Sequence, residues 1–489
     1  MTLKIIILSL YAVVIIAIGI TGFRKARSFS DYFLGGGKVG AWMTAFTYGT
    51  AYFSAVLFIG FAGKIGWGFG YSGLWIALGN TLVGVLAVWW ILGHRIKKMS
   101  VEYKVHTMAE FFDRRYHSPF LKLFASLSIF VFFIPYTAAV FMGLSYLFRS
   151  TFGIDYTLAL ILMGGFTAVY LVLGGYKSMT MIDTVFGMIM IVGVAVLLAC
   201  VLDRGDGLTG ITSGLAAIDT KLTGPIGPPG LWPLFSLVFL TSVAPLAMPQ
   251  LVQKFYAIKD KRAIRIGMIG STFFALLVTG IGYFTGATSR FFLNPDNAPM
   301  AFDGGKPIFD ALMPELLINL VPEGLLIIIL LLILSASMST LAALVLIASS
   351  TLAKDFYAGF INKDVSDKKL TLLMRLSSAF FVLLSIIMAY YKPSTIVGIL
   401  GISWGAIGAV FLGPFIWGLF SKRMTRAGAI SSSVLGLAAC LGLYFNGTPS
   451  PQAGTVGMIV SLAVNPIVSM FTKPTDSNTA IEERRAETI

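Results

Sequence analysis

Apolar stretches long enough to cross a membrane recur throughout this sequence. They have 19 to 29 residues, enough for a helix to cross the hydrocarbon core of a bilayer. They lie at 3–21, 41–63, 73–93, 119–147, 155–176, 181–202, 231–251, 266–289, 324–352, 370–391, 395–420, 427–446 and 453–471. The sequence therefore predicts an all-α integral membrane protein with about 13 transmembrane helices.

The overall composition agrees with this prediction. The 489 residues are 57% hydrophobic and only 12% charged, whereas a soluble domain of this length carries about 25% charged residues. We expect residues 1–473 to form a single transmembrane domain and residues 474–489 to form a polar cytoplasmic tail. Cys200 and Cys440 lie inside apolar stretches and are predicted to be buried thiols.

The basic residues are distributed as in a multi-pass membrane protein. The net charge is +14, but the lysines and arginines lie in short loops between apolar stretches, so the charge predicts orientation in a lipid bilayer and not nucleic-acid binding. If the N-terminus is outside, 28 of the 36 Lys and Arg residues fall on the inner side. We expect a protein of the inner (plasma) membrane with its N-terminus outside and its C-terminus in the cytoplasm.

The second stretch is interrupted near its middle. Residues 49–54 (Gly-Thr-Ala-Tyr-Phe-Ser) lie about halfway between Lys38 and Lys64, where an uninterrupted helix would carry leucine and isoleucine. Irregular backbone survives at this depth only where protein or an aqueous cavity covers it. An unwound turn exposes carbonyls to a cation and helix ends to an anion, which is typical of a transporter site. Close packing of helices through small residues is the alternative.

The seventh stretch is interrupted too. Residues 241–249 (Thr-Ser-Val-Ala-Pro-Leu-Ala-Met-Pro) contain Pro245 and Pro249, which remove backbone donors and break regular helix. Stretches 2–6 and 7–11 are two runs of five that enter the membrane from opposite sides, and the first member of each is interrupted. Paired breaks in inverted halves indicate a carrier that works by alternating access.

The ninth stretch offers oxygen ligands for a cation. Ser339 and Thr340 are adjacent hydroxyls on a predicted helix, with Ala336 one turn earlier. Two hydroxyls and the carbonyls of a broken helix supply enough oxygens for sodium without a carboxylate. Hydrogen bonding of these hydroxyls to the preceding turn of their own helix is the alternative interpretation.

Four motifs, in order and spacing, resemble the sodium/solute symporter family from Asp31 to about Ala427. They are residues 31–37 (Asp-Tyr-Phe-Leu-Gly-Gly-Gly), Gly174-Gly175 with Asp183-Thr184, residues 337–341 (Ser-Met-Ser-Thr-Leu) and residues 422–428 (Lys-Arg-Met-Thr-Arg-Ala-Gly). The resemblance implies a LeuT-type five-plus-five inverted repeat with helices 2 and 7 broken. It also implies sodium-coupled import of a small organic solute by alternating access, with sodium as the coupling ion.

The resemblance also implies site residues. The sodium ligands would be the carbonyls of Thr50, Phe53 and Ala336 and the hydroxyls of Ser339 and Thr340. Asp183 matches an aspartate on the family's sodium exit route. A carboxylate within an apolar span is a functional candidate in its own right, although a place in the first turn of span 6 would also stabilise it.

Departures from the family pattern bear on stoichiometry and substrate. Members with a second sodium site carry hydroxyls where this chain has Ala342 and Ala343, which favours one sodium ion per cycle. Tyr52 and Val56 stand where proline symporters have an aspartate and a tryptophan. Residues 50–55, 248–249, 259–261 and 409–414 look closer to the pantothenate carriers, so the chain resembles the pantothenate and proline branches more than the sugar branch.

The predicted solute pocket lies between the two breaks. Its candidate residues are Tyr52, Val56, Tyr136, Thr241, Ser242 and Trp404, with Asn80 and Gln250 as nearby amides. A cavity lined by aromatic rings and hydroxyls, without Lys or Arg, suits a monocarboxylate, a pantothenate-like molecule or an amino acid. Packing within the bundle is the alternative role of each aromatic residue.

Other classes of protein fit the sequence less well. His94, His106 and His117 all fall in one predicted inner loop. The predicted spans therefore lack the histidines that a metalloenzyme or a catalytic triad would use. A sensor that binds solute without moving it, and a proton-coupled symporter, remain as alternatives. The residues do not name the solute or the oligomeric state.

Overall fold

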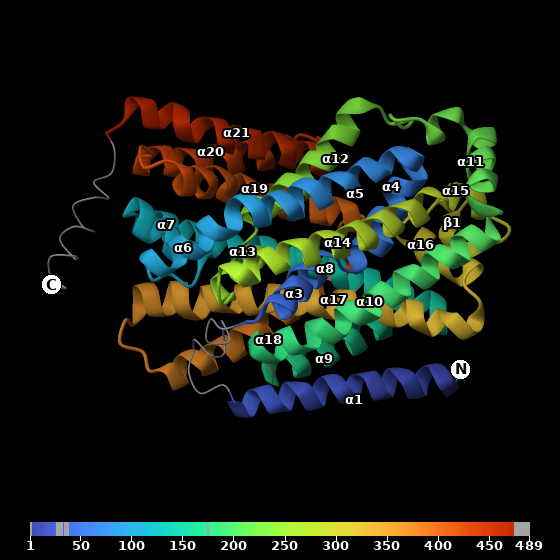
Figure 1. The fold of residues 1–489 in the computed structure, drawn as a ribbon, viewed down its shortest axis with the longest axis horizontal. Coiled ribbons are helices and arrows are strands. Elements are labelled where there is room, and N and C mark those ends of the chain that lie inside the picture. The colour runs from blue at the N-terminus through green and yellow to red at the C-terminus, as the bar shows by residue number, and fades with distance from the viewer. Residues whose placement is uncertain (1, 26–32, 34–38, 174–175, 474–489) are drawn as a thin grey trace.

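The computed structural model describes residues 2–25, 33, 39–173 and 176–473. Most of these residues belong to helices that run along the long axis of the molecule (Figure 1). Apart from Phe33, the predicted motif at 31–37 lies outside the described residues, as do Gly174, Gly175 and the predicted tail at 474–489.

The first half of the chain contains the first predicted span, the broken second span and four further spans. Its helices are α1 (Thr2–Lys25), α3 (Ala41–Tyr52), η2 (Val56–Phe61), α4 (Ala62–Phe69), η3 (Gly70–Gly73), α5 (Leu74–Gly79), η4 (Asn80–Gly93), α6 (His94–Glu102), α7 (Met108–Tyr116), α8 (Pro119–Phe152), α9 (Tyr156–Leu173) and α10 (Tyr176–Arg204).

The second half begins with the long 203–230 connection, which carries α11. Its elements are α11 (Gly207–Ile218), η5 (Thr220–Thr223), α12 (Leu231–Val243), η6 (Ala244–Ala247), α13 (Pro249–Ala257), α14 (Lys261–Ala287), α15 (Ser289–Phe292), η7 (Pro299–Ala301), β1 (Phe302–Asp303), β2 (Lys306–Pro307), α16 (Phe309–Leu320), α17 (Glu323–Ser350), η8 (Thr351–Ile361), α18 (Asp367–Tyr391), α19 (Ile396–Phe420), α20 (Arg426–Phe445) and α21 (Ser450–Phe471). Strands β1 and β2 pair antiparallel, with Phe302 opposite Pro307.

Helices occupy every predicted span. Within the described residues, ten helices are long and apolar enough to cross a membrane. One of these runs from Val56 to Glu102 and joins the second half of the broken span to the next span. The predicted spans at 3–21 and 155–176 are helices α1 and α9, whose described apolar parts are shorter. The exact count of 13 stays a prediction.

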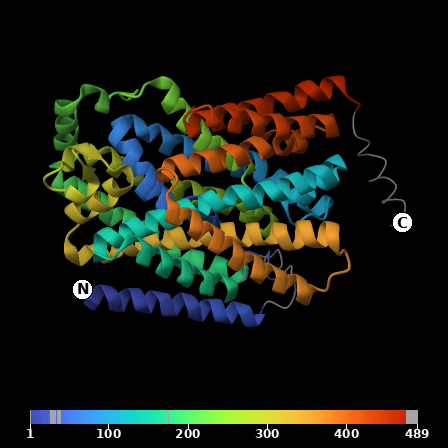
Figure 2. The same ribbon diagram turned by 180° about the vertical axis from the view of Figure 1, so that it is seen from behind.

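The two ends of the bundle differ in character. One end, which we call the loop end, carries the connections at 205–230 and 288–322, and α1 begins there (Figure 1). The other end, which we call the basic end, carries the connections at 103–118, 258–260, 362–366 and 421–425, and α21 ends there. Figure 2 shows the same arrangement from behind, with α1 and the α20–α21 pair on opposite flanks.

The flanking helices expose apolar side chains that lipid would cover. Leu10 on α1 is 62% exposed, Leu376 on α18 is 59% exposed, and Met470 on α21 is 79% exposed. An apolar surface of this kind is typical of a protein that has hydrocarbon as its solvent. In contrast, α17 is buried along most of its length and forms the centre of the bundle.

The predicted interruption of the second span is confirmed. Helix α3 ends at Tyr52, and Phe53 is extended, with φ −110° and ψ 119°. The amides of Ala55 and Val56 would continue the helix by bonding to the carbonyls of Ala51 and Tyr52. They bond instead to the hydroxyls of Ser337 at 3.0 Å and Ser54 at 3.2 Å, so the last carbonyls of α3 are released from the helix.

Gly49 has a different role from the break itself. It lies inside α3, and a Cβ atom there would come within 2.4 Å of the Phe274 ring on α14. Close packing therefore explains Gly49, while the unwound turn is confined to residues 53–54. Both interpretations of the 49–54 stretch apply, each to a different part of it.

The predicted interruption of the seventh span is also confirmed. Helix α12 ends at Val243, a short 3₁₀ turn follows, and α13 begins at Pro249. Met248 is extended, with ψ 119°, as expected for a residue before proline. Pro249 occupies the first helical position, where a missing N–H is tolerated.

Candidate functional site

The break in α3 faces the middle of α17, where the predicted hydroxyls lie. The Thr340 hydroxyl donates to the carbonyls of Thr50 and Ala51, each at 3.3 Å, and of Ala336 at 3.1 Å. The Ser339 hydroxyl donates to the Thr50 hydroxyl at 2.8 Å. Four of the five predicted sodium ligands are thus in mutual contact, and Phe53 lies at the end of the same unwound turn.

The two interpretations of the Ser339–Thr340 pair can be compared directly. Thr340 does bond to its own helix through the carbonyl of Ala336, but it also reaches across to α3. Ser339, Thr340 and Thr50 are completely buried. The result is a compact group of neutral oxygens between two helices, and neutral oxygens are ligands that a sodium ion accepts.

A cavity lies on the other side of the α3 break. The unwound turn and residues of η2, η4, α8, α12, α14 and α19 surround about 310 Å³ of empty space. Five of the six predicted solute residues line it. The full lining is Tyr52, Phe53, Ser54, Val56, Leu57, Phe61, Asn80, Tyr136, Thr241, Tyr283, Leu400 and Trp404.

Tyr52 connects the two broken spans across this cavity. Its hydroxyl donates to the carbonyl of Thr241 at 2.5 Å, and its ring lies 5.9 Å from that of Trp404. The Trp404 ring in turn lies 5.7 Å from that of Tyr136, edge to face. A glycine at position 84 leaves room for the Tyr52 hydroxyl, because a Cβ atom there would come within 2.5 Å of it.

Ser242 lies beside the cavity and does not line it. Asn80 lines the cavity and contacts Ser242. With its amide nitrogen turned toward α12, Asn80 donates to the hydroxyls of Thr241 at 3.0 Å and Ser242 at 3.2 Å. Gln250 is buried on α13 and does not line the cavity.

The sequence interpretation missed several lining residues. Leu57, Phe61, Tyr283 and Leu400 complete the cavity wall, and nothing in the local pattern distinguishes them from packing residues.

Asp183 lies deeper in its helix than predicted. Helix α10 begins at Tyr176, so the carboxylate is two turns inside the helix and the first-turn explanation is wrong. It is completely buried, and neither oxygen has a hydrogen-bond partner among the described residues. The hydroxyls of Thr47 and Ser339 lie close to it, which places the carboxylate next to the oxygen group between α3 and α17.

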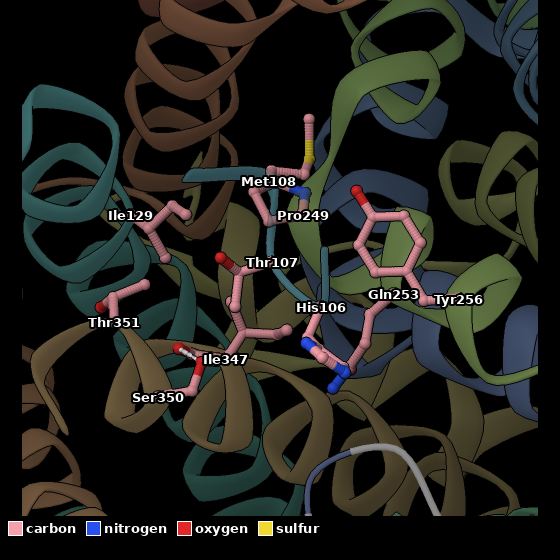
Figure 3. Close-up of a pocket in the computed structure, with 10 residues that line it drawn as sticks. All are labelled: His106, Thr107, Met108, Ile129, Pro249, Gln253, Tyr256, Ile347, Ser350 and Thr351. Carbon is pink, nitrogen blue, oxygen red and sulfur yellow. Dashed lines mark hydrogen bonds between the residues drawn. The ribbon is translucent and has the colours of Figure 1, made fainter. Parts of the chain in front are cut away.

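A second cavity, of about 240 Å³, lies toward the basic end (Figure 3). Residues of the α6–α7 connection, α7, α8, α13, α17 and η8 line it. They are His106, Thr107, Met108, Ile129, Pro249, Gln253, Tyr256, Ile347, Ser350 and Thr351. Pro249 is the first residue of α13, so this cavity begins where the seventh span resumes.

Polar contacts close the basic end beside this second cavity. The Thr107 hydroxyl donates to Asp355 at 2.9 Å, and Lys354 pairs with Glu110 at 3.0 Å. Glu110 also caps α7 by accepting from the amide of Thr107 at 3.3 Å, and it accepts from the amide of His106 at 2.7 Å. Burial alone would raise the pKa of Glu110, but the hydrogen bonds from His106 and the charge of Lys354 hold this pKa below its usual range.

The segments at the basic ends of the two broken spans pair with each other. The amide of Val39 donates to the carbonyl of Ala257 at 3.1 Å, and the amide of Lys259 donates to the carbonyl of Val39 at 3.1 Å. The approach to α3 is therefore joined to the end of α13. This pairing links the basic ends of the two broken spans.

Comparison with known proteins identifies the family. A sequence model of the sodium:solute symporter family matches residues 32–436. The chain belongs to the sodium:solute symporter family. Sodium is therefore the coupling ion, and a small solute is the partner that travels with it. The family and the matched relatives are transporters.

Curated relatives of similar length match almost all of the chain. The osmoregulated proline transporter OpuE of Bacillus subtilis is 28% identical over 97% of this chain and 96% of its own length. The sodium/pantothenate symporter of Escherichia coli is 29% identical over 87% of each chain. A sodium/proline symporter of Staphylococcus aureus is 27% identical over 96% of this chain and 92% of its own.

Solved structures confirm the fold. A Na⁺-coupled sialic acid symporter, in a substrate-bound outward-open state, superimposes with a TM-score of 0.81 at 17% identity, covering 96% of this chain and 98% of the other. Mhp1, a nucleobase-cation-symport-1 family transporter, gives a TM-score of 0.54 at 15% identity, covering 94% and 99%. The predicted LeuT-type architecture with two broken helices is therefore confirmed.

Proposed function

We propose that this symporter imports a small organic solute with a carboxylate and an apolar body, together with one sodium ion per cycle. One observation carries the proposal. The last turn of α3 and the middle of α17 share a group of buried oxygens, and the adjoining break at residues 53–54 lines the cavity. A cation and a solute bound there would share one element, which is what coupling requires.

The sodium ligands in this proposal are the carbonyls of Thr50, Phe53 and Ala336 and the hydroxyls of Ser339 and Thr340. The Thr340 hydroxyl lies within hydrogen-bond distance of carbonyls on both helices. A sodium ion would exchange these hydrogen bonds for coordination and hold α3 against α17. Its release would loosen the same contact.

The solute class follows from the cavity lining. The lining includes aromatic rings, hydroxyls and one amide, but no Lys or Arg. A solute carboxylate would be held by the N-terminus of the second half-helix, which starts at Val56, and by the bound sodium. The relatives named for proline and for pantothenate support this class, because both solutes combine a carboxylate with an apolar body.

The release route in this proposal leads to the basic end. The second cavity lies there and is lined by Pro249 of the second broken span and by Thr107 (Figure 3). The Thr107–Asp355 hydrogen bond and the Glu110–Lys354 ion pair lie beside it. Asp183 lies next to Ser339 and would mark the sodium exit. The excess of basic residues supports a cytoplasmic basic end, an outside N-terminus and a plasma-membrane location.

Uptake by proteoliposomes tests the proposal. Radiolabelled L-proline, pantothenate and lactate are offered to vesicles with an inward sodium gradient or an equal potassium gradient. We expect uptake of one of these compounds that requires sodium. Binding without uptake would indicate a sensor, and uptake driven by a proton gradient in potassium would indicate proton coupling. Either result would contradict the proposal.

A further inference from the structure

Helix α13 carries a buried cation. Lys254 lies in the second turn after the break at Met248–Pro249 and is 0% exposed. Its ammonium has no hydrogen-bond partner among the described residues and lies 5.1 Å from the centre of the Tyr176 ring. A charge buried in a membrane span is expensive unless an opposite charge lies nearby.

Asp183 supplies that opposite charge. It comes from α10, is 0% exposed, and leaves both oxygens without a hydrogen bond within the described part of the chain. The opposite charges of Lys254 and Asp183 attract each other, although the ammonium and the carboxylate form no hydrogen bond with each other. The two residues therefore form a neutral pair between α10 and the second broken span.

This pair adjoins the proposed sodium site. The Asp183 carboxyl lies close to Ser339, and the Ser339 hydroxyl donates to Thr50 at 2.8 Å. The carboxylate thus lies beside one of the proposed sodium ligands. Because the pair lies so near the proposed site, a net charge on the pair would change the electrostatic potential at the bound sodium ion.

The two α17 positions after Ser339 and Thr340 offer no side-chain oxygen for a second ion. Ala342 and Ala343 are buried and present only methyl groups. A second sodium ion would find no side-chain ligand at these positions, whereas an ammonium on a flexible side chain needs no such ligand to offset the carboxylate's charge.

We propose that Lys254 is a tethered cation that neutralises Asp183 in place of a second sodium ion and thereby sets the affinity of the neighbouring sodium site. The inference rests on the sodium site proposed above. Lys254 keeps the carboxylate from binding the transported ion too tightly for release. Asp183 keeps the ammonium from repelling that ion.

A double-mutant cycle on Lys254 and Asp183, with ²²Na⁺ binding as the readout and no solute present, tests this inference. Binding of ²²Na⁺ to the purified protein is measured at one pH for Lys254→Met, Asp183→Asn, the double variant and Lys254→Arg. We expect the sodium Kd to fall about tenfold in Lys254→Met and to rise about tenfold in Asp183→Asn. In the double variant and in Lys254→Arg, the Kd should stay within about threefold of wild type.

The opposite directions of the two expected Kd changes distinguish an electrostatic effect from damage to the fold. If both single variants weaken sodium binding, or the double variant fails to restore it, the tethered-cation inference is overturned. Thr340→Ala is measured alongside. If the wild type binds no sodium, or Thr340→Ala leaves its binding unchanged, the proposed sodium site fails instead.

Discussion

Tyr52 connects the two broken spans through one hydrogen bond and lines the solute cavity with its ring. Its hydroxyl donates to the carbonyl of Thr241, and its ring stacks on that of Phe53 with 4.3 Å between centroids. The residue thus joins α3 to α12 at the point where the solute is proposed to bind. The hydroxyl and the ring can be tested separately.

Tyr52→Phe keeps the ring and removes the hydrogen bond. A buried hydrogen bond contributes about 1 kcal/mol net, and its loss leaves the cavity wall less ordered. We expect the KM for the transported compound to rise about three- to tenfold, with the maximal rate changed less. Initial rates in proteoliposomes measure both values.

Tyr390→Phe is the matched control, because Tyr390 is 54% exposed on α18 and lies away from the cavity. It should leave the KM unchanged. An unchanged KM in Tyr52→Phe as well would mean that the link between the broken spans does not affect solute binding.

Among the elements, α4 and α14 approach each other closely through two glycines. A Cβ atom on Gly66 would come within 2.0 Å of the backbone of Gly286, and one on Gly286 would come within 2.1 Å of the backbone of Ala62. Backbone atoms cannot move aside as the end of a flexible side chain can. This contact holds the second half of the broken span against the bundle.

Gly66→Ala should therefore destabilise the protein. The strain of overpacking costs about 1–3 kcal/mol, so we expect the Tm of the purified protein in detergent to fall by several degrees. Gly280→Ala on α14 is the matched control, because no atom lies within 4 Å of its added Cβ. Equal melting temperatures for the two variants would exclude this packing role.

Asp310 connects α16 to the start of α19 at the loop end. Its carboxylate oxygens accept from the amide of Ile396 at 3.1 and 3.3 Å. Burial raises the pKa of Asp310 to about 6, although that hydrogen bond and the charges of Lys64 and Lys392 act in the opposite direction. The folded protein thus holds a proton on Asp310 at a pH where the unfolded chain does not.

The sign of the pH dependence follows. From about pH 4 to pH 6 the folded state binds more protons at Asp310 than the unfolded state, so the stability from this group decreases as pH rises and is constant above. The difference is at most about 2–3 kcal/mol. We expect Asp310→Asn to remove a decrease in Tm that the wild type shows between about pH 4 and pH 6.

Asp303→Asn, a change at an exposed carboxylate in the same loop-end segment, should keep the wild-type profile. If wild type and Asp310→Asn have parallel profiles, the carboxyl of Asp310 does not change its protonation on folding in this range.

For the whole molecule, the sequence predicted the features that depend on local chemistry. Pro245 and Pro249 mark the second break because proline cannot continue a helix, and the break at Phe53–Ser54 falls within the predicted stretch. Ser339 and Thr340 were identified as oxygen donors, and they meet Thr50 across the bundle as expected.

Features set by long-range packing were not predictable from local patterns. Tyr283 and Leu400 line the cavity only because α14 and α19 are positioned there by the fold. The pairing of Lys254 with Asp183 joins residues 71 positions apart. An apolar stretch shows that a helix will form, but it does not show which face of that helix another span will contact.

The central claim is that sodium binds between the α3 break and α17. Equilibrium binding of ²²Na⁺ to the purified protein, without any solute, tests it most directly. We compare wild type with Thr340→Ala and with Thr279→Ala, a buried threonine that bonds to its own helix at 2.7 Å. The account predicts one saturable sodium ion per chain, a Kd at least about tenfold weaker in Thr340→Ala, and no change in Thr279→Ala. Unchanged sodium binding in a folded Thr340→Ala protein would contradict it.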